Sequence, residues 1–183
     1  MPRFFDLSTS GKEAVAAAAQ AVRQGDLVIF PTETVYGLFF TKASEEKAFA
    51  IKGRAANKPC AVHVGSENAW RSLTGKLTPF QEEFIANHLP GPYTVLLPDK
   101  VGGVIGVRYP DLEICQAFLT AVGETVFGTS ANKSGEKSPA LIEETRALWP
   151  EVAVVADGGK LSGAASEVVD LTGKEVRILR NRK

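Results

Sequence analysis

The order of strand and helix signals constrains the fold of this 183-residue chain more than any other feature. Short apolar segments bounded by proline, glycine or polar residues predict about seven strands, at 4–7, 26–30, 60–64, 93–98, 103–109, 125–127 and 152–156. Two later segments, 167–171 and 175–180, predict a hairpin around 172–174. About five helices lie between the strands, at 11–24, 44–53, 80–89, 112–122 and 138–149. We therefore expect an α/β, or α+β-like, fold with a twisted mixed open sheet and flanking helices, and leave the strand order open.

Start and stop residues support these helix bounds. Ser10 can cap the first helix and Gly25 can end it. Thr78, Pro79 and Gln81 combine a threonine cap, a proline at the first helical position and a glutamine three residues after the cap. These signals predict a capping box at the start of the third helix.

Composition excludes several classes of protein. The chain is 44% hydrophobic and 23% charged, with 21 basic and 21 acidic side chains, which excludes disordered, collagen-like and coiled-coil chains and a basic nucleic-acid coat. Cys60 and Cys115 lie far apart without neighbouring ligands, which excludes a zinc ribbon. No apolar run approaches the roughly 20 residues of a membrane span, and the first residues lack a signal-peptide pattern. We expect a single cytoplasmic domain over residues 1–183 that does not bind a membrane.

Common catalytic motifs are missing from the sequence. There is no G-x-x-x-x-G-K-[ST] phosphate loop, no G-x-G-x-x-G after a strand, and no G-x-S-x-G elbow around Ser130. His63 and His88 are the two histidines available as bases. No pair of carboxylates recurs at the spacing of a metal site or an acid–base dyad, so no metal site is predicted.

A cluster of cations is the first positive signal. Lys52, Arg54 and Lys58 fall within seven residues that contain no acid. Arginine offers a bidentate fork and lysine a mobile point charge, so the segment can clamp a phosphate. The alternative is a solvated helix end whose cations complement the helix dipole.

Two turns rich in hydroxyl groups follow apolar strands. The segment 128–135 reads GTSANKSG, and 31–38 reads PTETVYGL, with the Glu33 carboxylate and Tyr36 as a possible lining residue. Small polar residues at a strand's carboxyl end are where open α/β sheets bind ligands, although ordinary capped turns have the same composition. Arg108 and Arg180 end strands, where a single arginine more often lies on the surface. The residues alone predict an anion-binding α/β domain.

Taken in order, these segments resemble the YrdC-type threonylcarbamoyl-AMP synthase family. The matching motifs are PTETVYGL, IKGR with NKP and VHV, LPGPYTVLLP, IGVRYPD, TSANKSG, SEVVDL and ILR, and they span nearly the whole chain. PTETVYGL and TSAN-x-SG together form a specific pair. Since the chain stops soon after ILR, it resembles the short, single-domain form of the family.

The resemblance implies a twisted sheet around a deep cationic cavity and a reaction of L-threonine, bicarbonate or CO2, and ATP. The products would be threonylcarbamoyl-AMP and pyrophosphate, with Mg2+ carried by the nucleotide. The adenylate would feed the threonylcarbamoyl modification of tRNA, through a downstream threonylcarbamoyl-transferase complex. Carried over by position, the threonine-binding residues would be Thr32, His63, Arg108, Ser130 and Ser166. The ATP-binding residues would be Lys52, Arg54, Lys58, Asn132, Ala140 and Arg180, with Lys52 and Arg54 also catalytic.

Several positions depart from the family pattern. Ala55 replaces a usual proline, Cys60 a usual leucine, and Glu167 a common threonine. Leu112 stands where histidine often follows Pro-Asp, and Ala140 stands at a site that usually carries a hydroxyl, so a nucleotide contact there would come from its backbone. Two other interpretations stay open. These departures leave room for a YrdC-like paralogue that uses another acceptor, and the cation cluster also suits a non-catalytic module that binds tRNA or double-stranded RNA in tRNA or ribosome maturation.

Overall fold

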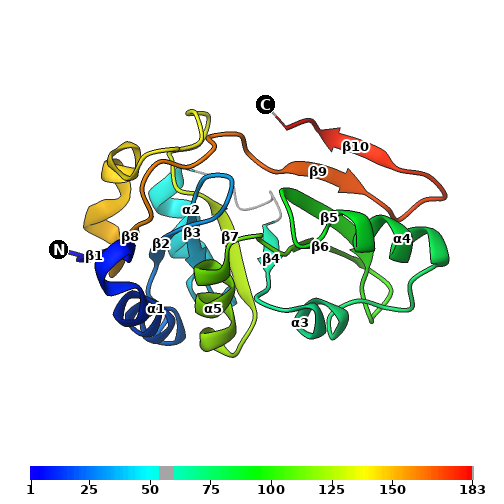
Figure 1. Cartoon of the computed structure of the whole chain (residues 1–183), viewed down its shortest axis with the longest axis horizontal. Helices are drawn as coiled ribbons and strands as arrows, with labels where there is room; N and C mark the ends of the chain where they lie inside the picture. Colours follow the sequence, from blue (N-terminus) through cyan, green and yellow to red (C-terminus); the bar gives the residue numbers. More distant parts are fainter. Residues whose placement is uncertain (54–59, 183) are drawn as a thin grey trace.

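A single mixed sheet of ten strands organises the computed structural model, which describes residues 1–53 and 60–182 (Figure 1). The strands are β1 Arg3–Asp6, β2 Val28–Pro31, β3 Tyr36–Phe40, β4 Ala61–His63, β5 Tyr93–Pro98, β6 Val104–Arg108, β7 Val126–Ser130, β8 Val154–Asp157, β9 Glu167–Asp170 and β10 Arg177–Arg180. The helices are α1 Leu7–Arg23, α2 Glu45–Lys52, α3 Glu67–Arg71, α4 Pro79–His88 and α5 Glu113–Val122, with 3-10 segments η1 Lys42–Ser44 and η2 Ile142–Glu151.

The strand order across the sheet is β1-β8-β2-β3-β7-β4-β6-β5-β9-β10. Four neighbouring pairs are parallel, namely β1 with β8, β2 with β8, β4 with β6, and β5 with β9. The other pairs are antiparallel. The predicted fold class, an open mixed sheet with flanking helices, is confirmed.

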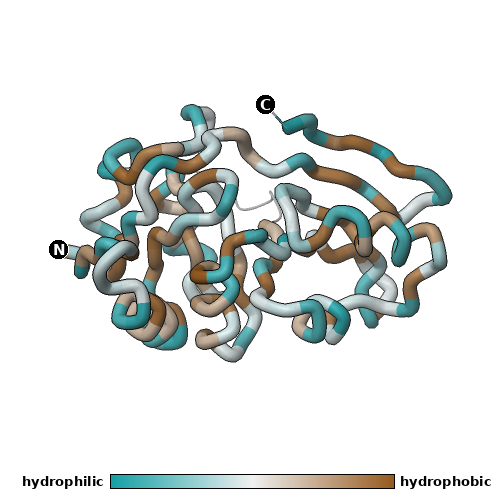
Figure 2. The backbone as a smooth tube through the Cα atoms, viewed as in Figure 1, coloured by the Kyte–Doolittle hydropathy of each residue, from teal (hydrophilic) through white to brown (hydrophobic). Residues whose placement is uncertain are grey.

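Helices cover both faces of the sheet from β8 to β7. On one face, α1 and α5 pack on β2, β3, β7 and β8 through a core that includes Phe30, Phe39 and Phe118. On the other face, α2 and η2 pack against Ile29, Leu38 and their neighbours. Residues of both clusters alternate along the same strands, so these strands are apolar on both sides. Figure 2 traces the resulting hydrophobic segments through this part of the molecule.

From β4 to β9, the helices that the structure describes cover only one face. There α3 and α4 pack on a third core, which includes Trp70, Val95 and Val107. The opposite face carries polar and small residues at the alternate positions, such as Thr94, Gly106 and Arg108. This uncovered face continues the face that α1 and α5 cover in the other half, and it forms the wall of the main cavity.

Most local signals in the sequence are confirmed. Thr78 and Gln81 form the predicted capping box of α4. Gly53 and Gly123 end α2 and α5 in the left-handed conformation, with φ of 62° and 74°. Strands β9 and β10 form the predicted antiparallel hairpin.

Other expectations about elements were wrong. A helix follows Ser10 as expected, but a further helical turn that begins at Leu7 with Asp6 as its cap precedes it, and Ser10 is the non-helical residue at the kink between the two. The helix expected from residue 138 is a 3-10 segment that begins at Ile142. The physical reason is that the carbonyl groups of Pro139 and Ala140 accept hydrogen bonds from Tyr36 and Leu161, so neither carbonyl is used in a helix. Strand β3 and helix α3 were missed.

Candidate functional site

The main cavity, of about 480 Å³, lies on the uncovered face and falls within the size range of small-molecule sites. Three glycines on its strands keep the wall free of side chains: Gly37 on β3, Gly106 on β6 and Gly128 on β7. A Cβ at Gly128 would lie 2.5 Å from the His63 ring, and one at Gly106 would lie 3.2 Å from Leu96. The glycines therefore provide the depth of the cavity.

The cavity brings together six of the residues expected at the site from positions far apart in sequence. Those that line it are Thr32, His63, Arg108, Ser130, Ser166 and Arg180. Two of them, Arg108 and Arg180, give the cavity its positive charge.

Of the other expected residues, some lie away from this cavity and some lie outside the described residues. Lys52, Asn132 and Ala140 do not line this cavity, and Arg54 and Lys58 lie outside the described residues, as does Ala55. The backbone of Ala140 bonds within the protein, since its N–H donates to Glu144 Oε2 at 2.6 Å and its carbonyl accepts from Leu161.

Arg108 is held firmly in the cavity wall. Its side chain is 3% exposed, and its Nη2 donates to Glu33 Oε1 at 2.7 Å and to Thr34 Oγ1 at 3.5 Å. Its Nη1 donates to the carbonyl groups of Gly91, Tyr93 and Tyr109. The guanidinium therefore has a fixed orientation at the end of β6.

Arg180 sits across the cavity on β10. Its Nε and Nη2 donate to the Ser166 carbonyl at 3.1 and 2.7 Å, and Nη2 also donates to Ser166 Oγ at 3.1 Å. Ser166 Oγ lies 3.0 Å from Thr94 Oγ1. Burial, followed by the positive charge of Arg108, lowers the pKa of Arg180. The charge of Arg108 therefore acts on Arg180 across the cavity.

His63 is neutral at physiological pH. Burial, together with the positive charge of Arg108, lowers the pKa of His63 to about 3. Its Nδ1 lies 3.2 Å from the Ala61 carbonyl, which can only accept, so Nδ1 carries the proton and Nε2 is an acceptor. The ring also packs edge-on against Phe39, with centroids 5.2 Å apart.

The two motifs at Lys52 and at 128–135 are joined physically. Lys52 is 4% exposed, and its Nζ donates to the carbonyl groups of Ser130 and, at 2.7 Å, Asn132. In return, the carbonyl of Lys52 accepts from the Ser134 N–H at 2.7 Å. The ammonium group of Lys52 therefore holds the loop that carries Ser130.

Asn132 is buried beside this loop. Its Nδ2 donates to the carbonyl groups of Lys133 and Glu136, at 2.9 and 2.8 Å. Its Oδ1 is a buried acceptor without a hydrogen-bond partner among the residues that the structure describes.

Two residues of PTETVYGL have internal roles. The Thr32 hydroxyl donates to the Val35 carbonyl at 2.8 Å and accepts from backbone N–H groups of the same turn, so it shapes the turn at the cavity. Tyr36, expected as a possible lining residue, is fully buried, and its hydroxyl donates to Asp157 Oδ1 and the Gly159 carbonyl. That expectation was wrong because position 36 points into the core under α2.

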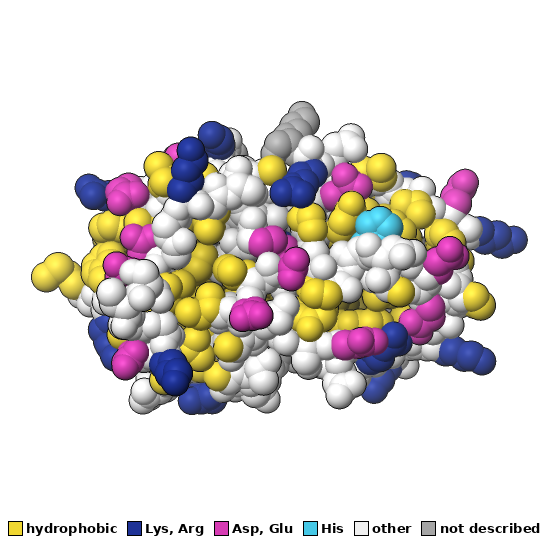
Figure 3. Space-filling model, in the orientation of Figure 1, with side chains coloured by type: hydrophobic (Ala, Val, Ile, Leu, Met, Phe, Trp, Pro, Cys, Tyr) yellow, Lys and Arg dark blue, Asp and Glu magenta, His cyan; other side chains and the backbone are white. Residues whose placement is uncertain are grey.

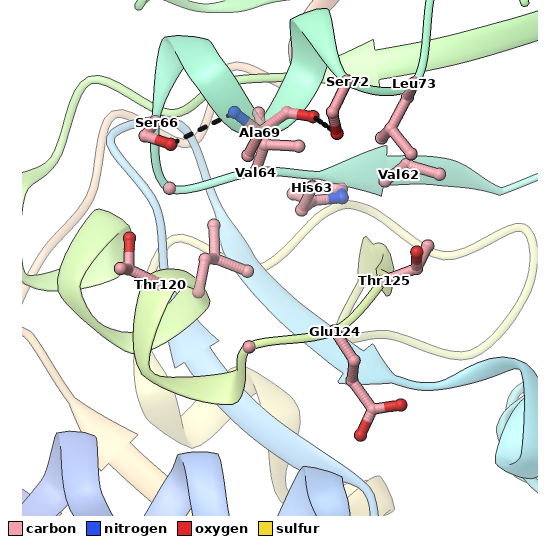
Figure 4. Close-up of a pocket in the computed structure, with 13 residues that line it drawn as sticks. Val62, His63, Val64, Ser66, Ala69, Ser72, Leu73, Thr120, Glu124 and Thr125 are labelled. Carbon is pink, nitrogen blue, oxygen red and sulfur yellow. Dashed lines mark hydrogen bonds between the residues drawn. The ribbon is translucent and has the colours of Figure 1, made fainter. Parts of the chain in front are cut away.

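A second cavity of about 330 Å³ lies between α3 and the end of α5 (Figure 4). His63 lines both cavities. The second is otherwise lined by apolar and hydroxyl side chains and Glu124, with no lysine or arginine among its described lining residues. It lacks the positive charge that an anionic ligand needs, so the first cavity is the candidate site.

Sequence reasoning missed several lining residues, including Thr94, Leu96, Val104, Val168 and Leu179. They sit on the same face of β5, β6, β9 and β10, and the glycines within two strands, Gly106 and Gly128, were an available signal of this hollow.

Neither a metal site nor a membrane span is found in the part of the chain that the structure describes. No group of three or more His, Cys, Asp or Glu residues there could hold a metal ion. Among the described helices, none is long and apolar enough to cross a membrane. On the face in Figure 3, lysines and arginines lie in separate groups, and acidic side chains lie both among these groups and near the middle.

Comparisons with known proteins agree with this fold. The family model Sua5/YciO/YrdC, described as telomere recombination, matches residues 20–181. The threonylcarbamoyl-AMP synthase of Pyrococcus abyssi is 33% identical over 86% of this chain and 51% of its own length. A putative threonylcarbamoyl-AMP synthase of Mycobacterium tuberculosis is 31% identical over 91% of this chain and 82% of its own length. The chain spans 51% to 64% of the first three curated relatives.

Comparison with solved structures shows the same fold. The crystal structure of Pyrococcus abyssi Sua5 complexed with L-threonine superposes with a TM-score of 0.89 at 28% identity, over 100% of this chain and 57% of that one. Escherichia coli YciO has a TM-score of 0.85 at 23% identity, over 100% of this chain and 96% of that one, and shows the shared fold. On the matched motifs, the sheet and the family model, this chain belongs to the Sua5/YciO/YrdC family.

Proposed function

We propose that this protein catalyses the formation of L-threonylcarbamoyl-AMP and pyrophosphate from L-threonine, bicarbonate or CO2, and ATP. The observation that carries the proposal is that five residues expected to bind threonine line one cavity: Thr32, His63, Arg108, Ser130 and Ser166. The names of the curated relatives support the same activity.

Threonine would bind with its carboxylate toward Arg108, the cation of the cavity wall. Neutral His63 would accept a hydrogen bond at Nε2 from the threonine hydroxyl or amino group. Ser130 and Ser166 would add hydroxyl contacts from β7 and from the start of β9. Because the strands fix each of these residues, the amino acid would be oriented before reaction.

The chemistry requires little from a protein nucleophile. Bicarbonate supplies CO2 by losing hydroxide. The threonine amine attacks CO2, a C–N bond forms, and the proton that leaves to give a carbamate converts the hydroxide to water. A carbamate oxygen then attacks the α-phosphorus, and the bond to the β-phosphate oxygen breaks to release pyrophosphate. Holding these atoms in line contributes up to ~7–11 kcal/mol, and cations stabilise the charge on the departing pyrophosphate.

The nucleotide would enter as MgATP, with magnesium arriving as part of the substrate. Arg180 lies in the cavity with neutral oxygen partners, which suits it to contact phosphate. Lys52 would contribute charge and hold the Ser130 loop, and Arg54 and Lys58 remain proposed ATP ligands that lie outside the described residues. Asn132, whose Oδ1 is buried and has no partner among the described residues, remains a proposed ATP ligand beside this loop.

We further propose that the product passes to a threonylcarbamoyl-transferring enzyme in the cytoplasm and that tRNA is its final recipient. The adenylate is a reactive mixed anhydride, so a second enzyme must consume it soon after release.

The test is pyrophosphate release by the purified protein with ATP, Mg2+ and bicarbonate, with and without L-threonine. We expect release only when threonine is present, and a marked rise in the threonine Michaelis constant for Arg108→Gln. The control is Lys174→Gln, which removes an exposed charge in the turn between β9 and β10 and should leave the rate unchanged.

Release that is independent of threonine would contradict the proposal. No pyrophosphate release with threonine, together with release in the presence of another amine, would indicate a different acceptor. Tight, salt-sensitive RNA binding without any turnover would instead favour the non-catalytic RNA-binding interpretation.

A further inference from the structure

The two arginines of the cavity differ in their partners. Arg108 forms an ion pair with Glu33, with an Nη2–Oε1 distance of 2.7 Å between side chains that are 3% and 18% exposed. Arg180 has the neutral oxygens of Ser166 as its partners, and no carboxylate pairs with it among the described residues. One cation of the cavity therefore has a counter-ion within the described structure, and the other does not.

Glu33 acts on the cavity without lining it. It lies in the turn between β2 and β3, and it reaches Arg108 across 75 positions of sequence. Its second oxygen, Oε2, is buried without a hydrogen-bond partner among the described residues. Within that part of the chain, Arg108 is the cation with which this carboxylate forms an ion pair.

A ligand anion at Arg108 would meet this carboxylate as a second negative charge. Like charges a few ångströms apart in a low-dielectric wall repel each other, and the repulsion grows with the charge of the ligand. A singly charged carboxylate is therefore tolerated beside Arg108 better than a polyphosphate. At Arg180, no carboxylate of the described residues is paired so as to repel a phosphate in this way.

We infer that Glu33 is a specificity-determining counter-ion. Its charge allows a singly charged ligand carboxylate to bind at Arg108 but disfavours phosphates there, so phosphates bind at Arg180. The assignment of that carboxylate to threonine rests on the proposed function. The sorting of anions between the two arginines does not, because it can be measured with simple ions.

The experiment compares wild type with Glu33→Gln, an isosteric variant that keeps an oxygen for Arg108 and removes the charge. Sodium acetate and sodium pyrophosphate are the probes, and the Nε–H NMR signals of Arg108 and Arg180 report where each binds. In wild type, acetate should shift the Arg108 signal, and pyrophosphate should shift the Arg180 signal first. In Glu33→Gln, pyrophosphate should bind at Arg108 at least about tenfold more tightly, and acetate should gain less.

Two variants serve as controls. Glu33→Asp keeps the charge and should retain the wild-type preference. Glu82→Gln, on α4, removes the exposed carboxylate that forms an ion pair with Arg71 and should change neither affinity.

A folded Glu33→Gln whose pyrophosphate affinity at Arg108 is unchanged or weaker would overturn the inference. If that variant does not fold, wild type alone decides, because pyrophosphate shifting Arg108 before Arg180 would also overturn it. A separate titration with L-threonine keeps the outcomes distinct. Absence of threonine binding would refute the proposed function while the sorting of acetate and pyrophosphate still tests Glu33.

Discussion

The two halves of the sheet differ in how many faces the helices cover. In the half formed by β8, β2, β3 and β7, apolar clusters lie on both faces. In the half formed by β4, β6, β5 and β9, one face carries an apolar cluster and the other carries the cavity. The covered half supplies most of the buried aromatic packing, and the half-covered one supplies most of the wall on which ligands would bind.

This difference is visible along single strands. Strand β2 is buried at every residue from Val28 to Pro31. Strand β5 alternates, with Val95 and Leu97 fully buried in the core and Thr94 and Leu96 lining the cavity. A continuous run of buried residues therefore indicates a strand covered on both faces. Alternation between buried and partly buried residues indicates a strand with one open face.

The largest expected effect is a loss of stability in the covered half. Phe118 stacks on Phe30 with ring centroids 4.6 Å apart and meets Phe39 edge-on at 5.5 Å. Phe118→Ala should lower the free energy of unfolding by about 3–5 kcal/mol, measured by urea denaturation, because it leaves a cavity in a closed core. Leu179→Ala, at a side chain that is 49% exposed beside the cavity, should cost far less. Equal losses would erase the distinction between the halves.

The second effect concerns ligand binding in the cavity, at β7, the strand of the covered half that pairs with β4 of the open half. Gly128→Val places a Cβ 2.5 Å from the nearest atom of the His63 ring and should displace that ring. We expect threonine affinity to fall about a hundredfold, as for a catalytic group misplaced by an ångström, while the fold is retained. Calorimetric titration measures this, with Gly173→Ala as the control, since a Cβ there meets nothing within 4 Å. Unchanged affinity would show that the ring position is irrelevant to binding.

The third effect is on pH dependence. The pKa of His63 is about 3 in the folded protein, below its ordinary value of 6.5, so the unfolded state binds the extra proton between these values. The stability contributed by neutral His63 is present above pH 6.5 and is lost as pH falls toward 3, by at most about 1.4 kcal/mol per pH unit.

His63→Gln should remove this contribution to the change of unfolding free energy with pH, measured by urea denaturation at several pH values from about 7 to about 4. His88→Gln is the control because His88 lies on α4 outside the cavity. An identical slope in His63→Gln and wild type would contradict the assignment.

The smallest effect tests the single helical cover of the open half. Thr78→Ala removes the capping bond to the Gln81 N–H and should cost about 1 kcal/mol. Gln81 Nε2 also donates to the Leu171 carbonyl at 2.7 Å, so exchange of amide hydrogens should accelerate in β9 more than in β2. Uniform acceleration across the sheet would show that the two halves open together.

Much of the site could be anticipated from sequence, but its assembly could not. Motif resemblance selected Arg108, Arg180 and Ser166, and all three line the cavity. It did not pair Glu33 with Arg108, and it left Tyr36 as a lining residue although that side chain is buried in the core. These relations depend on which way each strand faces, and the short polar turn at 32–35 gives no local signal of that direction.

The sequence by itself determined the features that rest on neighbouring residues. The capping box at Thr78, the glycine stops after α2 and α5, and the hairpin of β9 and β10 are all formed by groups a few positions apart. Only the tertiary structure decided which face of the sheet stays open and which cation has a counter-ion. Those outcomes depend on a strand order that brings residues from the whole chain to one wall, where burial and charge act together.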